Sequence, residues 1–358
     1  MMAILSPISS SEPMFKPIIS SMSKSPDRGS VHAVAVKALQ TKAVRIERLD
    51  GSIFRNYRLQ PTSDYFYVLK CRPSSRLRLL SQEEERLQAE ALVLQSLRGT
   101  SDVLVPRLIE YHTTPTPMGS PYLINGPFKG SILSDIEASL SRHAFSSIDK
   151  SLGRYVRQLS HISGPAFGAI RTGTPPTSPS WSRCFAALLE SILRDGENAL
   201  ITLPYDFIRD QVRRHRQVLD QITQPKLVLL EMASDQNVLI NTNEYTVAGL
   251  LDFSTAIWGD PFMSDCFHKP RLGFVEGFGR LPNRDTNERI RQYLYGLYHS
   301  LLAVVRHCYR PSGDGDELAA RRTLVSSQPV ARDVTEMCWC LERSSFRTRL
   351  CHVVLEYS

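Results

Sequence analysis

Residues 237–253 read NVLINTNEYTVAGLLDF, two short apolar runs with a polar side chain at each outer end. The runs Asn237 to Ile240 and Tyr245 to Leu251 are rich in aliphatic and β-branched residues, and this composition favours two short strands. Asn237 opens the first run and Asp252 directly follows the second. Taken singly, an Asn at this place suits a turn and an Asp suits a cap, so neither residue alone indicates a function.

Towards the N-terminus, the pattern describes a small antiparallel sheet with one packed helix. Alternating or aromatic-rich runs predict strands at 44–46, 54–59, 65–71, 107–112 and 122–125. Apolar residues at positions 87, 91, 94 and 97 have helical spacing and predict a helix over 83–97. Lys70 ends an otherwise apolar strand and Glu90 lies on the inner side of the helix, although a solvated lysine and an ordinary helix charge would look the same.

Beyond Gly130 the pattern becomes mainly helical. Apolar residues keep helical spacing over 148–162, 185–193, 208–222 and 287–309. Only between Lys226 and Asp252 do short strand-like runs replace the helices. The chain thus consists of a sheet-containing part followed by a helical part.

The chain order of Lys70, a helical Glu90, Asn237 and Asp252 resembles that of the protein-kinase-like phosphotransferases, in the aminoglycoside phosphotransferase and choline-kinase branch and its fungal type. The resemblance extends over residues 44–322. Its further segments are Leu49-Asp50-Gly51 to Tyr57-Arg58-Leu59, Val68-Leu69-Lys70, Val105-Pro106-Arg107-Leu108, Pro121-Tyr122-Leu123-Ile124, Gly249-Leu250-Leu251-Asp252-Phe253, and Gly259-Asp260-Pro261 with Asp265. It implies an α+β, two-lobed protein-kinase-like fold: a small antiparallel-sheet N-lobe with one packed helix, and a larger, mostly helical C-lobe.

The resemblance also implies the domain boundaries. The N-lobe would span residues 43–126 and the C-lobe residues 127–324. Residues 1–42 begin with a Ser-, Pro- and Met-rich stretch and are expected to form a disordered leader. Residues 325–358 lack a clean amphipathic pattern and are expected to form a divergent tail.

For the site, the resemblance implies a phosphotransferase that uses ATP and Mg²⁺. Gly51 would lie in the hairpin that covers the phosphates, Lys70 would contact the α- and β-phosphates, and Glu90 would hold the lysine. Asn237 and Asp252 would bind the metal, since amide and carboxylate oxygens are the hard ligands that Mg²⁺ prefers; Asp252 would also be catalytic. Catalysis would then consist of positioning and charge neutralisation.

The expected catalytic loop, H-x-D-x-x-x-x-N, is altered in this chain. Counting back from Asn237 places Leu230 at the His position and Met232 at the Asp position, and a thioether cannot accept a proton. A one-residue shift of the loop would bring Glu231 into place as the catalytic base. The sequence therefore predicts either a phosphotransferase of a small-molecule hydroxyl with a weakened or relocated base, or an impaired pseudokinase that binds nucleotide or acts as a scaffold. A repurposed site that binds a metabolite without nucleotide is a third interpretation.

The composition argues against several other classes of protein. The 43 Lys and Arg against 36 Asp and Glu give a net charge of +7, which is modest for a nucleic-acid-binding protein. No apolar stretch has the length of a membrane span. Seven cysteines without C-x-x-C pairs are typical of reduced thiols, so we expect a cytoplasmic protein. The sequence does not indicate the acceptor compound or the oligomeric state.

Overall fold

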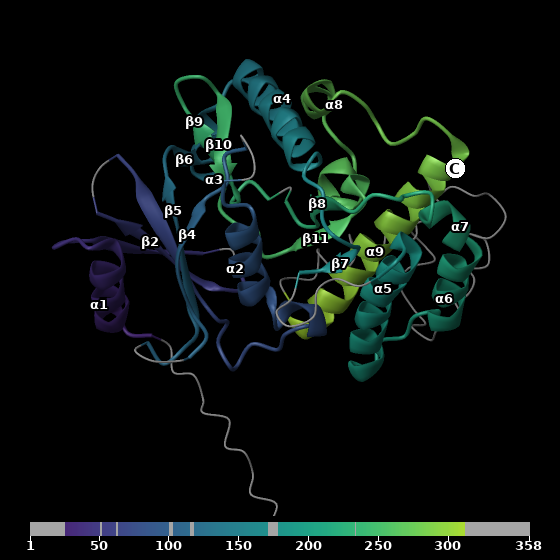
Figure 1. The fold of residues 1–358 in the computed structure, drawn as a ribbon, viewed down its shortest axis with the longest axis horizontal. Coiled ribbons are helices and arrows are strands. Elements are labelled where there is room, and N and C mark those ends of the chain that lie inside the picture. Colours follow the sequence, from purple (N-terminus) through teal and green to yellow (C-terminus); the bar gives the residue numbers. More distant parts are fainter. Residues whose placement is uncertain are drawn as a thin grey trace, which may run out of the picture.

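The structure is a computed structural model that describes residues 26–50, 52–61, 64–99, 103–114, 118–170, 178–232 and 234–311. These residues form two unequal lobes, with a sheet in the first and most of the helices in the second (Figure 1). Gly51 and the predicted tail, residues 325–358, lie outside the described residues. Within the described part of the chain, no helix is both long enough and apolar enough to cross a membrane.

The N-lobe is built on one antiparallel sheet of five strands, in the order β1-β2-β3-β5-β4. The strands are β1 (Arg45–Leu49), β2 (Arg55–Gln60), β3 (Phe66–Cys71), β4 (Arg107–His112) and β5 (Tyr122–Phe128). The register places Lys70 opposite Asn56 of β2 and Leu123 of β5, in the middle of the sheet. The strands and helix α2 (Arg86–Ser96) confirm the arrangement expected from the sequence.

Helix α1, Arg28–Leu39, covers one face of this sheet (Figure 1). The prediction of a disordered leader over residues 1–42 is therefore wrong for this part of the chain, while residues 1–25 lie outside the described residues. The helix begins at a capped residue, because the side chain of Asp27 accepts a hydrogen bond from the backbone N–H of Ser30 at 2.6 Å.

The buried side of α1 is short, which explains why the sequence did not predict it. Its buried residues are Val31, Val34 and Ala35. They pack against the side chains of Leu59, Leu69, Cys71, Tyr122 and Ile124 in the sheet. Burial of this apolar surface stabilises both elements by about 25 cal/mol per Å². Apolar residues lie on more than one side of α1, since Ala33 is exposed and Val36 only partly buried, so the sequence gives little periodic signal. The sheet therefore supplies most of the reason for this helix to form.

The C-lobe is mainly helical and contains two small sheets. Its helices are α3 (Leu133–Ile136), α4 (Arg142–Leu159), α5 (Trp181–Asn198), α6 (Tyr205–Arg214), α7 (Arg216–Leu219), α8 (Leu272–Phe278) and α9 (Thr286–Tyr309). The described residues also form 3₁₀ turns, namely η1 (Ser81–Glu83), η2 (Glu137–Ser139), η3 (Pro261–Met263) and η4 (Asp265–Phe267). The sheets have the orders β10-β9-β6 and β7-β11-β8. They consist of β6 (Ser131–Ile132), β7 (Gly168–Ala169), β8 (Lys226–Leu229), β9 (Val238–Asn241), β10 (Thr246–Leu250) and β11 (Ala256–Gly259).

The hairpin of β9 and β10 brings together the two polar ends of the stretch that opened the sequence analysis. Val238 pairs with Leu250, so the residues just outside this pair meet as well. The backbone N–H of Leu251 donates a hydrogen bond to the carbonyl oxygen of Asn237 at 2.9 Å. The hairpin therefore places Asp252 beside Asn237, where both can face the N-lobe.

The packing of α1 can be tested by a charge in its buried side. We expect Val31→Asp to lower the free energy of unfolding by about 2 kcal/mol or more, because the unpaired carboxylate would lie among apolar side chains. Val31 is fully buried, whereas Ala33 on the same helix is exposed. Ala33→Asp is the matched control and should change the free energy by less than about 0.5 kcal/mol. Urea denaturation followed by circular dichroism measures both; equal effects would contradict the packing of α1 on the sheet.

Candidate active site

Lys70 lies near the end of β3 with its side chain only 1% exposed. Its ammonium donates hydrogen bonds to both carboxylate oxygens of Glu90, at 2.6 and 2.8 Å, and to Asp252 Oδ1 at 3.0 Å. A buried ammonium is stable only when its charge is paired, because taking it out of water is costly. The structure thus joins three of the residues predicted from the sequence around one positive charge.

Glu90, on α2, is fully buried and connects this helix to the C-lobe. Its Oε1 accepts hydrogen bonds from Asn125 Nδ2 at 3.3 Å and from the backbone N–H of Phe253 at 3.2 Å. Burial raises the pKa of Glu90 to about 7, against the opposing effect of the Lys70 ammonium. The charge of Glu90 therefore depends on Lys70 staying in place.

Asn237 and Asp252 are held side by side by backbone contacts. Asn237 Oδ1 accepts a hydrogen bond from the Asp252 N–H at 2.7 Å. Asp252 Oδ1 accepts one from the Ser254 N–H at 2.9 Å, in addition to that from Lys70. Burial alone would raise the pKa of Asp252, but Lys70 and the Ser254 N–H outweigh it and the pKa lies below its ordinary value. At neutral pH the pair therefore presents a carboxylate and an amide oxygen.

These residues line a cavity of about 460 Å³ to which both lobes contribute. Its apolar lining includes Leu49 and Val68 of the N-lobe and Ile132 and Leu251 of the C-lobe. Its polar lining includes Lys70, Asn237 and Asp252 together with Asp50, Asn56 and Asp135. Apolar walls with a few convergent polar groups are the usual form of a site for a small molecule.

Glu231 also lines the cavity, but its carboxylate is not free. Arg86 Nη2 donates a hydrogen bond to Glu231 Oε1 at 2.5 Å, and Arg306 Nη2 lies 2.8 Å from Oε2. Burial opposes the ionisation of Glu231, yet the two arginines lower its pKa to about 2. A carboxylate with so low a pKa is a weak proton acceptor at neutral pH. A base at Glu231 therefore stays a prediction, and its ion pairs argue against it.

Met232, at the position expected for the catalytic Asp, lies in the hydrophobic core and not at the wall of the cavity. Its side chain is 1% exposed and belongs to the core that α4 and α8 help to form. It is absent from the described residues that line the cavity. Its backbone N–H donates a hydrogen bond to Asp265 Oδ1 at 2.8 Å, which fixes the loop. An Asp at this position would thus be buried in an apolar core unless the loop moved.

Sequence reasoning missed Asp135 and, in addition, four charged residues of the cavity wall that ion pairs connect. They are Glu83, Arg86, Arg306 and Arg310, and with Glu231 they form what we call the arginine–glutamate chain. Arg306 lies between the carboxylates of Glu231 and Glu83, and its Nε is 3.6 Å from Glu83 Oε1. Arg310 contacts Glu83 at 2.6 and 2.7 Å. A partial signal was present, because Arg86 precedes Glu90 by four residues, which places both on one face of α2.

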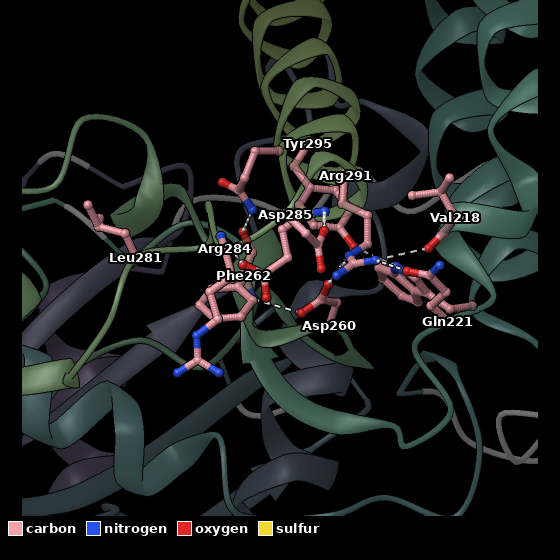
Figure 2. Close-up of polar contacts among 12 residues, drawn as sticks. Val218, Gln221, Asp260, Phe262, Leu281, Arg284, Asp285, Arg291 and Tyr295 are labelled. Carbon is pink, nitrogen blue, oxygen red and sulfur yellow. Dashed lines mark hydrogen bonds and ion pairs between the residues drawn. The ribbon is translucent and has the colours of Figure 1, made fainter.

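Asp260 anchors α9, the helix that carries Arg306 and is directly followed by Arg310 (Figure 2). Its Oδ2 accepts a hydrogen bond from the hydroxyl of Tyr295 at 2.7 Å and lies 3.7 Å from Arg291 Nε. Arg291 Nη1 donates in turn to the carbonyl oxygen of Val218 at 3.1 Å. Burial raises the pKa of Asp260, and the tyrosine and arginine oppose this effect. The network ties the first half of α9 to the rest of the C-lobe.

The sequence model of the phosphotransferase enzyme family matches residues 45–263. The chain belongs to this family. The match covers the whole sheet of the N-lobe and the residues from Lys70 to Asp252 that meet at the cavity. No curated protein matches this chain.

Solved structures of other proteins have a fold similar to that of this chain. A candidate aminoglycoside phosphotransferase from Ralstonia eutropha has 15% identity and a TM-score of 0.57, covering 88% of this chain and 97% of that one. A candidate fructosamine-3-kinase from Thermobifida fusca has 16% identity and a TM-score of 0.56, covering 83% and 100%. The ternary complex of streptomycin, ATP and APH(2")-IIa has 13% identity and a TM-score of 0.54, covering 84% and 97%. These likenesses confirm the predicted α+β, two-lobed protein-kinase-like fold.

The oxygen ligands at the cavity suit Mg²⁺ better than a metal that is held by protein ligands alone. Within the described ranges, no group of three or more His, Cys, Asp or Glu side chains could hold a metal ion. Mg²⁺ usually takes one or two protein oxygens and completes its shell with phosphates and water. The carboxylate of Asp252, whose side chain is 33% exposed, and the amide of Asn237 would be those two ligands.

Lys70→Met tests the central ion pairs. Without the ammonium, Glu90 becomes a buried carboxylate without a counter-ion and the partly exposed Asp252 loses its own, so we expect the free energy of unfolding at about pH 8 to fall by roughly 3–5 kcal/mol. The loss should be smaller at about pH 5, where Glu90 takes up a proton because its pKa is raised. Adding Glu90→Gln should recover part of the loss at the higher pH. Denaturant titrations measure all three proteins, and a loss independent of pH and of the second substitution would contradict the pairing.

Glu231→Gln tests the charge state of that carboxylate. Because the pKa of Glu231 is about 2 in the folded protein against an ordinary 4.5, its ionised form stabilises the fold above pH 4.5. This contribution is lost as the pH falls from 4.5 towards 2. The difference in melting temperature between wild type and variant should therefore be largest near neutral pH and shrink in acid. A difference that stays constant across this range would mean that the arginines do not hold Glu231 charged.

Proposed function

We propose that the chain is an ATP- and Mg²⁺-dependent phosphotransferase whose acceptor is a hydroxyl group of a small molecule. The observation that carries the proposal is the Lys70 ammonium, held between Glu90 and Asp252 on the wall of a cavity of about 460 Å³. The family match over residues 45–263 supports phosphoryl transfer as the class of reaction. The fold neighbour solved with streptomycin and ATP supports a nucleotide and a small-molecule acceptor as the two substrates.

The roles of the residues follow from their charge and placement. Lys70 would neutralise phosphate oxygens of ATP, and Glu90 would keep the ammonium in place. Asp252 and Asn237 would hold Mg²⁺, which when bound neutralises charge on the transferred group. Transfer breaks the bond between the γ-phosphorus and its bridging oxygen and forms a bond to the acceptor oxygen. Because Glu231 is held by two arginines, the acceptor proton would leave to water, and the usual 10²–10⁴-fold contribution of a base would be absent.

A second function is favoured by a specific observation at the catalytic loop. Met232 lies in the core and Glu231 is engaged in ion pairs, so neither supplies a free carboxylate to an acceptor. A protein with this loop and an intact lysine site would bind nucleotide and transfer phosphate slowly or not at all. This is the catalytically impaired, nucleotide-binding or scaffolding form.

We further propose a cytoplasmic location. Cys71, Cys184 and Cys266 are buried and free in the structure. Buried thiols that form no disulfide suit a reducing compartment. Fractionation of cells that express the tagged protein would test this assignment.

Melting temperatures with and without Mg·ATP separate the alternatives. Ligand at about 100 times its Kd should stabilise the fold by about 2.7 kcal/mol. Asp252→Asn should weaken binding of Mg·ATP more than binding of ATP without metal, because it removes a charged ligand and keeps the shape. Asp206→Asn, at a fully exposed carboxylate of α6, is the control and should behave as wild type.

Turnover then decides between the two functions. Release of ADP that depends on an added hydroxyl compound supports the phosphotransferase, and binding without turnover supports the impaired form. If Mg·ATP does not change the melting temperature of the wild-type protein, the phosphotransferase and the nucleotide-binding form both fail, and only the scaffolding form is left.

A further inference from the structure

The segment of residues 78–86, between β3 and α2, belongs by sequence to the N-lobe but packs into the C-lobe. Leu80 is fully buried in the core that α5, α6 and α9 form. The backbone N–H and the hydroxyl of Ser81 donate hydrogen bonds to the two carboxylate oxygens of Asp195 on α5, at 2.9 and 2.6 Å. We call residues 78–86 the docking segment.

Further contacts join the docking segment to α9. Tyr298 donates a hydrogen bond from its hydroxyl to Gln82 Oε1 at 2.9 Å. Arg310 Nη1 donates to the carbonyl oxygen of Arg78 at 2.8 Å, and the Arg78 guanidinium lies 4.1 Å from the ring centroid of Tyr309. Polar and apolar contacts thus attach the whole segment to the second lobe.

Glu83 makes the strongest of these attachments. Its carboxylate has no exposed surface and accepts hydrogen bonds from Arg310 Nη1 and Nη2 at 2.7 and 2.6 Å, one to each oxygen. The backbone N–H of Leu80 donates to the same carboxylate at 2.9 Å, and Arg306 Nε lies 3.6 Å away. A bidentate contact between guanidinium and carboxylate fixes both distance and orientation. Because a buried carboxylate without a counter-ion is costly, Glu83 can leave Arg310 only with a large loss of stability.

This attachment is only seven residues from Glu90. Helix α2 begins at Arg86, three residues after Glu83, and Glu90 follows one helical turn later. Arg86 pairs in addition with Glu231, so a second contact holds the first turn of α2 against the C-lobe. Helix α9, which provides the C-lobe side of these contacts, is itself fixed, because Asp260 anchors its first half (Figure 2). A short helix moves as one body, so holding its first turn sets the position of Glu90.

We propose that Glu83 and Arg310 are positioning residues of the phosphotransferase site. They hold α2 against the C-lobe, so that Glu90 keeps the Lys70 ammonium in place whether or not a nucleotide is bound. They act through Glu90 and take no part in the transfer itself. The consequence for nucleotide binding rests on the proposed function, whereas the positioning of α2 is a property of the ligand-free protein and can be measured without it.

Hydrogen–deuterium exchange of the ligand-free protein tests the positioning. Glu83→Gln should make the amides of α2, Arg86–Ser96, exchange about tenfold to hundredfold faster, because a charge-assisted contact at the helix start is lost. Exchange in α4 should not change. Arg310→Gln should have the same effect, and the double variant should be little worse than the larger single one, because each substitution already breaks the pair. Glu84→Gln is the matched control, since Glu84 is exposed and carries the same charge one residue further on.

Affinity for Mg·ATP, measured by calorimetry, is the second readout. Loosening of α2 in Glu83→Gln and Arg310→Gln should weaken binding about tenfold or more, with no change in Glu84→Gln. If the two residues had a merely structural role, the substitutions would lower the melting temperature. Well below that temperature, however, they would not make the amides of α2 exchange selectively faster. Should Glu83→Gln not fold, Arg310→Lys keeps the charge, loses the bidentate contact and should show a smaller effect of the same kind.

The outcomes separate this inference from the proposed function. Wild-type exchange of α2 in both single variants overturns the inference, whatever the protein binds. Faster exchange with unchanged affinity for Mg·ATP also overturns it, because the site would then not depend on the attachment. If the wild-type protein does not bind Mg·ATP, the proposed function fails, and exchange of α2 alone supports or overturns the positioning.

Discussion

The rest of the structure depends on one constraint: the buried ammonium of Lys70 must be paired with carboxylates. The two carboxylates that stabilise it come from different lobes, Glu90 from α2 and Asp252 from the end of the β9–β10 hairpin. The ammonium is therefore fully paired only when the lobes are in contact. The buried sheet, the short hairpin and the docking segment all serve to bring these two carboxylates to one point.

The pairing of buried charges also explains the unusual catalytic loop. Four cations, Lys70, Arg86, Arg306 and Arg310, face four anions, Glu83, Glu90, Glu231 and Asp252, in contacts that link α2, α9 and the C-lobe loops. In this balanced arrangement the charge of Glu231 is already used to hold Arg86 and Arg306. A carboxylate cannot at once be a firm partner of two guanidinium groups and a ready proton acceptor. Structural pairing and base catalysis therefore compete for the same side chain.

The sequence predicted the parts of this site that depend on local pattern. The pattern predicted the strand, the helix and the strand-like runs on which Lys70, Glu90, Asn237 and Asp252 lie, and their chain order, by its resemblance to the phosphotransferases, marked them as site residues. The pairing of Glu83 with Arg310 was not predicted, because it joins residues more than two hundred positions apart and no periodicity connects them. The low pKa of Glu231 was invisible for the same reason, since its cause lies in neighbours on other helices. Helix α1 was missed because the sheet, rather than its own sequence, stabilises it.

The positions of α1 and α9 bear on what counts as a unit of folding. The stretch of this chain that matches the family model, residues 45–263, includes neither helix. A chain trimmed to that stretch would leave an apolar face of the sheet open to self-association. It would also remove Arg306 and Arg310, and with them counter-ions of the Glu83 and Glu231 carboxylates. The matched stretch is thus shorter than the smallest piece of this chain that we expect to fold independently.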